Sequence, residues 1–171
     1  MAGLVDRVRA SQHLIVTLLA AWLILTSPWV AMLRRMPREP GVFDYAHVYV
    51  GLTALLFAVT YCLDCSRKGG WRLCFPWLSG QSHVVWSDLR GLFRGRIPAA
   101  ESGGLFGALA GLTLLAFLAA GLTGAAWLWT QGTPEALDWR GHHFLAVRAL
   151  TVLIMLHAVA VALHVLDFVR D

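Results

Sequence analysis

The sequence predicts an all-α membrane protein, a bundle of four transmembrane helices with both termini in the cytoplasm. Hydrophobic residues make up 58% of the 171-residue chain and charged residues only 14%. The charges stand in clusters that alternate with long apolar runs, which is typical of membrane proteins. A helix needs about 20 mostly apolar residues to cross a bilayer. The runs of that length are residues 11–33, 43–63, 104–129 and 141–168, which form a single transmembrane domain over residues 1–171.

The first span begins close to the start of the chain. A separate signal peptide would not fit before it, and no small-residue cleavage site follows its apolar run, so we expect it to be retained. Pro37, Pro40 and Gly41 predict a short loop before the second span.

The third span starts with a stripe of small residues, Gly103, Gly107 and Gly111, whose four-residue spacing lets membrane helices approach closely. A second short loop is predicted over residues 131–138, which include Gly132 and Pro134.

Lysine and arginine are divided unequally between the two sides, and their excess is expected in the cytoplasm. With cytoplasmic termini, that side carries nine of these residues and the other side four. The nine are Arg7, Arg9, Arg67, Lys68, Arg72, Arg90, Arg94, Arg96 and Arg170, and the four are Arg34, Arg35, Arg38 and Arg140. The sequence therefore predicts a multi-pass protein of the inner membrane with both termini cytoplasmic. The net charge of +4 reflects this topology and not binding of nucleic acid.

The cytoplasmic connection, residues 64–102, is the one long loop. Within it, residues 83–96 combine apolar side chains with Arg90, Arg94 and Arg96 in a pattern suited to a short helix in the lipid headgroup region. An ordinary solvated loop helix explains the pattern equally well.

Three cysteines, Cys62, Cys65 and Cys74, lie on the same side, where thiols stay reduced, so no disulfide framework is expected. With His83 they have the residue types of a three-cysteine, one-histidine metal site. We favour free cysteines and predict no such metal site, because the gap to His83 is loose and Cys62 stands at the end of a span.

Histidine is the polar residue that recurs inside the predicted spans, where ionisable side chains are costly and usually serve a function. The residues concerned are His13, His47, His142, His143, His157 and His164. Fourteen residues separate His143 from His157, which is about 40° short of four helical turns and a rise of about 21 Å. Both rings should therefore share one face of the last span at two depths. Val147, Leu150 and Ile154 lie between them on that face.

The other two spans offer one histidine for each depth. His47 lies near the outer start of the second span, and His13 lies in the cytoplasmic half of the first. The pattern predicts two six-coordinate haem irons, one between His47 and His143 and one between His13 and His157. After His47, the small residues Gly51, Ala54 and Ala58 would let a flat macrocycle lie close to the backbone. A single histidine or a single small-residue stripe more often serves helix packing, and the prediction depends on the whole set.

The chain resembles the four-helix di-haem cytochromes b, which include membrane subunits of respiratory formate dehydrogenases and nickel-iron hydrogenases and the bacterial b-561 cytochromes. The resemblance covers nearly the whole chain and is carried by His13 in SQHLIV, His47 in YAHVYVGL, and the run HFLAVRALTVLIMLHAVAVALH with His143, His157 and His164. It implies two haem b groups, with the fourth helix supplying one ligand to each haem and the first two helices the others. His142 remains an alternative to His143.

The resemblance further implies transfer of electrons across the membrane between a quinone and a redox partner. The chain is then the electron-transfer subunit of a respiratory oxidoreductase complex, and a stand-alone quinone-linked cytochrome is the alternative. A non-redox scaffold or transporter has little support, because only Pro28 interrupts a span.

Two further residues carry expectations. His164 lies seven residues beyond His157 on the same face, about 10 Å nearer the cytoplasm, and we expect it to border a quinone or haem-propionate site unless it is an interfacial histidine without a ligand. Arg148 faces away from the haem stripe, where an arginine is costly. We expect it to meet a partner subunit, together with the outer arginines 34, 35 and 38; snorkelling to headgroups and packing within the chain are the alternatives.

Overall fold

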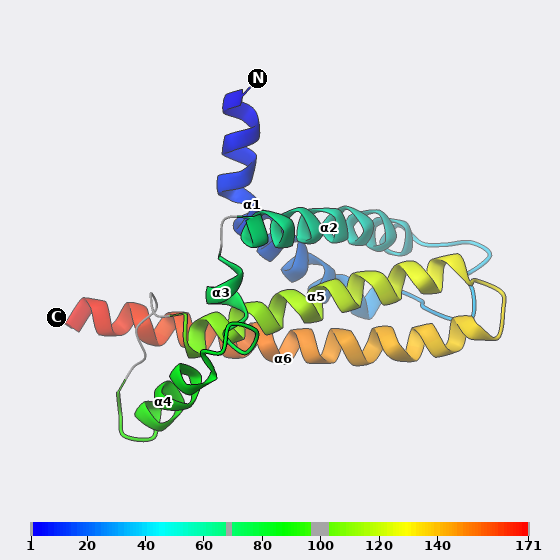
Figure 1. The fold of residues 1–171 in the computed structure, drawn as a ribbon. Helices are drawn as coiled ribbons and strands as arrows, with labels where there is room; N and C mark the ends of the chain where they lie inside the picture. Colours follow the sequence, from blue (N-terminus) through cyan, green and yellow to red (C-terminus); the bar gives the residue numbers. More distant parts are fainter. Residues whose placement is uncertain (1, 68–69, 97–102, 171) are drawn as a thin grey trace. The chain divides into compact units, whose positions relative to one another are not determined.

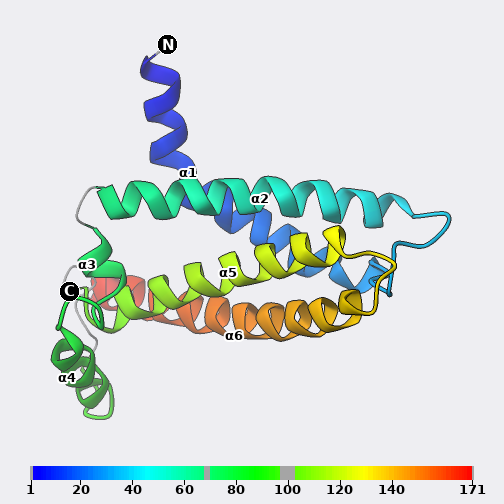
Figure 2. The same cartoon turned by 45° about the vertical axis from the view of Figure 1, so that its right-hand side comes forward.

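The computed structural model describes residues 2–67, 70–96 and 103–170, with residues 2–10 and 166–170 described as backbone only. Every regular element in this part is a helix. The elements, drawn in Figure 1 and turned by 45° in Figure 2, are α1 (Ala2–Thr26), the 3-10 turn η1 (Ser27–Trp29), α2 (Val42–Arg67), α3 (Trp71–Cys74), α4 (Ser82–Leu92), α5 (Leu105–Trp129) and α6 (Glu135–Arg170).

Four of these helices are long and apolar enough to cross a membrane. The candidate spans are Ser11–Trp29, Val42–Arg67, Leu105–Trp129 and Glu135–Val165. Large apolar side chains are exposed along them, among them Leu18, Leu56, Leu122 and Leu145 at 58–67% of their full area. Such surfaces suit lipid rather than water. The prediction of an all-α membrane protein with four spanning helices is confirmed.

The chain divides into two compact units, and both α5 and α6 run through the two. The first unit contains Met1–Leu63 and Ala116–Ala149, and the second contains Asp64–Leu115 and Leu150–Asp171. In the first unit, the C-terminal half of α5 lies antiparallel beside the N-terminal half of α6, as Figures 1 and 2 show.

The first span ends earlier than the sequence suggested. Residues 30–33 were predicted as helix, but α1 stops at Thr26, a single 3-10 turn follows, and Val30 is extended (φ −101°, ψ 124°). The cause is Pro28, which has no N–H to bond the carbonyl of Ile24. The hydroxyl of Ser27 donates to that carbonyl instead, at 2.9 Å.

The last helix begins earlier than predicted, at Glu135 rather than residue 141. The segment 131–138 was predicted as a loop because Gly132 and Pro134 stand in it. Proline is tolerated at the start of a helix, where its missing N–H has no partner to lose. Glu135 and Asp138 in the first turn favour the positive end of the helix dipole. Pro134 therefore starts the helix here.

The non-helical chain after η1 is held by side chains of the helices in the first unit. Asp44, only 7% exposed, accepts hydrogen bonds from the N–H groups of Ala31 and Gly41, each at 2.8 Å. The indole of Trp127 donates to the carbonyl of Leu33 at 2.8 Å. Backbone polar groups near a membrane need such partners. These bonds hold the loop to the N-terminal end of α2 and the C-terminal end of α5 in this unit.

In the second unit the glycine stripe of α5 packs against α3. A Cβ on Gly107 would overlap the carbonyl oxygen of Leu73, and one on Gly111 would overlap that of Cys74. The close approach predicted from this spacing therefore exists, but its partner is a short helix of the connecting loop. Because glycine has no Cβ, the backbone carbonyls of Leu73 and Cys74 fit against the surface of α5 at these positions.

Candidate functional site

His143 is held on α6 by the facing part of α5. Its Nδ1 lies 2.9 Å from the carbonyl oxygen of Ala120 and 3.4 Å from the hydroxyl oxygen of Thr123. A carbonyl only accepts, so Nδ1 donates its proton and Nε2 keeps its lone pair. Histidines that bind metals are oriented in this way, with one nitrogen donating to a carbonyl and the other free for the metal.

Gly124 on α5 leaves room for the His143 ring because it has no side chain. A Cβ on Gly124 would lie 3.2 Å from both Cε1 and Nδ1 of His143, tighter than an ordinary contact. A polar threonine followed by a glycine inside an apolar helix was the sequence signal for this support, and sequence reasoning did not use it. Thr123 and Gly124 thus join the candidate site as positioning residues.

His47 lies on α2 in the same unit. Its ring is within electrostatic range of the His143 ring and of the Asp44 carboxylate. Its Nδ1 is buried and makes no hydrogen bond with any described residue. A buried polar nitrogen without a partner is costly, so this atom fits a side chain whose partner is a bound group or water. The structure brings His47 and His143 together, and their donor chemistry fits an iron held by two imidazoles.

The small residues after His47 do not lie open for a macrocycle. Ala54 is 1% exposed and Ala58 is 0% exposed, so both are packed against protein. A Cβ on Gly51 would lie 3.9 Å from the side chain of Leu23 on α1. The stripe serves helix packing in the first unit, and the prediction that it forms a haem bed is wrong for Ala54 and Ala58.

His142, the neighbour of His143, is exposed, and its ring makes an edge contact with Trp139, with ring centroids 5.7 Å apart. His143 is half-buried and faces α5. Of the two adjacent histidines, the one turned into the protein is His143.

His13 lies on α1 and is exposed, with its ring centroid 6.1 Å from that of Tyr61 on α2. His157 and His164 belong to the second unit. Nδ1 of His157 is buried, whereas the His164 side chain is exposed and its ring centroid lies 5.9 Å from that of Phe106. The roles predicted from the sequence for His13, His157 and His164 therefore stay predictions.

Among the described residues, no three side chains of histidine, cysteine, aspartate or glutamate lie together as a metal site. Cys62, Cys65 and Cys74 are half-buried thiols outside any disulfide. His83 instead lines a groove on α4.

The arginines expected to meet a partner differ in their surroundings. Arg148 is exposed on α6. Arg34 is also exposed, but its Nε donates to the carbonyl of Thr133 at 3.2 Å, so it holds the loop between α5 and α6.

Comparison with known proteins gives one positive result. The model of the prokaryotic cytochrome b561 family matches residues 6–167. The comparisons with curated proteins and with solved structures find no match. The family match removes the scaffold and transporter alternatives. The chain belongs to the prokaryotic cytochrome b561 family and is a multi-pass inner-membrane protein that binds haem b and transfers electrons.

Proposed function

We propose that this cytochrome holds two haem b groups, each by two histidines, and carries electrons between a membrane quinone and a redox partner. One pair is His47 with His143, and the other is His13 with His157. A haem held by two histidines would supply one-electron transfer, with no ligand position left for a substrate.

The observation that carries this proposal is the orientation of His143 beside His47. The carbonyl of Ala120 fixes the tautomer of His143 and leaves its Nε2 lone pair available to a metal. Gly124 leaves space for the ring on one side. A histidine that served only helix packing would not need a fixed tautomer. It would also not need a second imidazole nearby, that of His47, whose Nδ1 has no hydrogen-bond partner among the described residues.

The continuous α6 supports two sites at different depths. It carries His143 and His157 on one face, and the rise between them is about 21 Å. Leu150, between them on that face, is 3% exposed, and no charged side chain interrupts the stripe. Electrons entering at one histidine pair leave at the other, so the chain joins the two membrane faces.

Both termini are proposed to be cytoplasmic, from the excess of basic residues on that side. His47 and His143 then lie near the outer face. His164, with its exposed ring beside Phe106, borders the quinone or a haem propionate near the inner face. The chain acts as the membrane subunit of a respiratory oxidoreductase complex; the stand-alone quinone-linked cytochrome is the alternative, and co-purification of a partner separates the two.

Optical spectroscopy of the purified protein tests the central proposal. The reduced-minus-oxidised spectrum should show b-type α and Soret bands, and extracted haem should equal two per chain. A ratio of one haem per chain would show that one of the two histidine pairs is not a site.

A further inference from the structure

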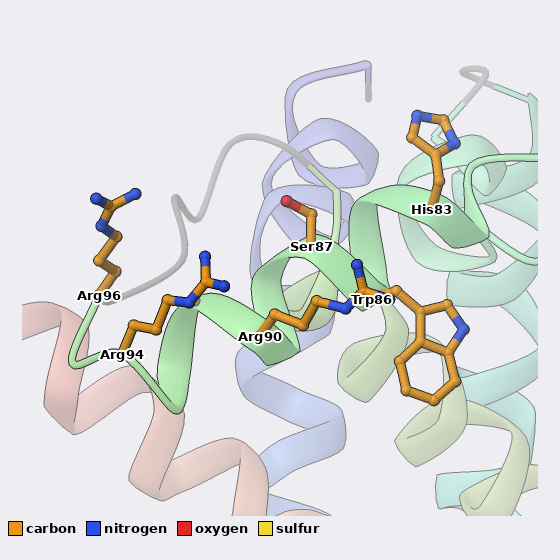
Figure 3. A pocket seen from close by; sticks show the side chains of 7 residues that line it. His83, Trp86, Ser87, Arg90, Arg94 and Arg96 are labelled. Atoms are coloured by element: carbon orange, nitrogen blue, oxygen red, sulfur yellow. The ribbon is translucent and has the colours of Figure 1, made fainter.

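Helix α4 and the turn after it form an open groove of about 630 Å³ in the second unit. Its lining residues are His83, Trp86, Ser87, Arg90, Gly91, Arg94 and Arg96. Figure 3 shows the side chains of Ser87 and His83 on one side of the helix, and those of Arg94 and Arg96 turned the same way. None of the histidines proposed to hold haem lines this groove.

The backbone turn that ends α4 builds the groove. Arg96 N–H donates to the carbonyl of Gly91 at 2.9 Å, and Gly95 N–H donates to that of Leu92 at 3.0 Å. These two bonds, with Gly95 in the left-handed region (φ +74°), are a Schellman motif. The motif folds the chain back, so that Arg96 lies beside the last turn of the helix that carries Arg90.

The groove is positively charged and has no carboxylate in its lining. Its three arginines are exposed. Asp88 is the one acidic residue within α4, and its Oδ2 accepts the N–H of Leu105 at 2.9 Å, at the start of α5. The ligand that complements three guanidinium groups is an anion, and arginine forks suit phosphate in particular.

The bond from Asp88 also places the groove at the membrane surface. Leu105 is the first residue of one spanning helix, and Arg67 is the last residue of the span before it. The connection between them therefore starts and ends at one face of the bilayer. The hydrogen bond from Leu105 to Asp88 holds α4 at the N-terminal end of α5.

Exposed apolar side chains beside the arginines also fit a position at the membrane surface. Trp86 is 62% exposed, and Phe93, just after α4, is 86% exposed. Large aromatic residues next to arginines are typical of helices that lie in the headgroup region. In water this surface would be unfavourable.

We propose that Arg90, Arg94 and Arg96 bind the phosphate of an anionic phospholipid, with Trp86 and Phe93 inserted among the neighbouring lipids. Arginine donates hydrogen bonds to phosphate oxygens, and the anionic leaflet attracts each basic residue near its surface. The binding fixes the connection between α2 and α5 to the membrane. It does not depend on the assignment of the haem ligands.

Native mass spectrometry of the full-length haem-loaded protein, released from mild detergent, tests this proposal. Phosphatidylglycerol and phosphatidylcholine are offered together as probes. The protein should retain phosphatidylglycerol, and the triple variant R90A/R94A/R96A should bind it on the order of 100-fold more weakly. The matched control R34A/R35A/R38A loses the same charge from the other connection and should retain the lipid.

Two results would overturn the proposal. If R90A/R94A/R96A retains phosphatidylglycerol as the wild type does, the groove is not its site, and an acidic protein surface becomes the better ligand. If inorganic phosphate in excess displaces the lipid and binds alone, the ligand is a soluble anion. An unchanged haem spectrum in R90A/R94A/R96A shows that the variant is folded.

Hydrogen exchange in nanodiscs gives a second measurement that does not rely on detergent. Backbone amides of residues 82–96 should exchange more slowly in phosphatidylglycerol than in phosphatidylcholine, and this difference should vanish in R90A/R94A/R96A. Equal exchange in both lipids for the wild type would contradict the proposal. The R90K/R94K/R96K variant, which keeps the charge but not the fork, should show an intermediate difference.

Discussion

Nδ1 of His143 donates a hydrogen bond to the carbonyl oxygen of Ala120 across 2.9 Å, from one spanning helix to the next. This bond fixes which nitrogen of His143 is available as a ligand. It joins residues 23 positions apart in the chain, within the unit that also contains His47. The predictions about the haem sites begin from it.

Replacement of single histidines should separate the two sites. His143→Ala and His47→Ala should lose the same haem, and His157→Ala and His13→Ala should lose the other, because in the proposed arrangement each pair holds one iron. Haem content per chain and redox titration of each variant measure this. His142→Ala is the matched control and should retain both haems. Loss of the same haem from His13→Ala and His143→Ala would disprove the pairing.

Gly124→Ala should disturb the haem that we propose His143 holds. The new Cβ would lie 3.2 Å from two ring atoms, so the ring must shift against its bond to Ala120. We expect retention of that haem to weaken by about tenfold and its potential to shift. Gly141→Ala on α6 is the control, since a Cβ there meets nothing within 4 Å. Equal potentials in both variants would show that Gly124 does not position the ligand.

Asp44→Ala should destabilise the N-terminal end of α2. It leaves the N–H groups of Ala31 and Gly41 without their partner. A hydrogen bond to a charged group contributes about 1.5–3 kcal/mol, so the temperature of haem release should fall. Asp138→Ala, at an exposed position in the first turn of α6, should change it little. If both variants release haem at the wild-type temperature, Asp44 does not hold this loop.

His164→Ala should retain both haems and slow quinone-linked reduction. The loss of one hydrogen bond to a bound quinone corresponds to about a tenfold weaker interaction. His83→Ala, an exposed histidine outside the spans, should leave the rate unchanged. Removal of a haem by His164→Ala, with both haems kept in His157→Ala, would reverse the roles of these two residues.

Arg148→Leu should weaken assembly with a partner subunit, because an exposed arginine on a spanning helix needs an acceptor. The measurement is the yield of partner protein that co-purifies under mild detergent. Arg34→Leu is the comparison, since Arg34 already bonds Thr133 within the chain. An unchanged partner yield and unchanged quinone-linked activity in Arg148→Leu would favour snorkelling to headgroups.

The sequence by itself determined the membrane class and the four spans, and it predicts that His143 and His157 share one face of the last span. These properties are local. Hydropathy follows from composition over about 20 residues, and the face follows from the period of the helix. The family match likewise depends on the order of residues along the chain, over residues 6–167. The loop helix was also found from its pattern, with its end displaced from residue 96 to Leu92.

Only the tertiary structure decided which side chains meet. It showed His143 rather than His142 facing α5, the backbone of α3 in the glycine stripe, and Asp88 bonded to the start of α5. It also showed Ala54 and Ala58 packed against protein. Each of these depends on contacts between distant parts of the chain. The helical period predicts which residues share a face of a helix, but not which residues pack against that face. Pro28 and Pro134 show the same limit, because a proline ends one helix and begins another according to the partners available to the neighbouring backbone.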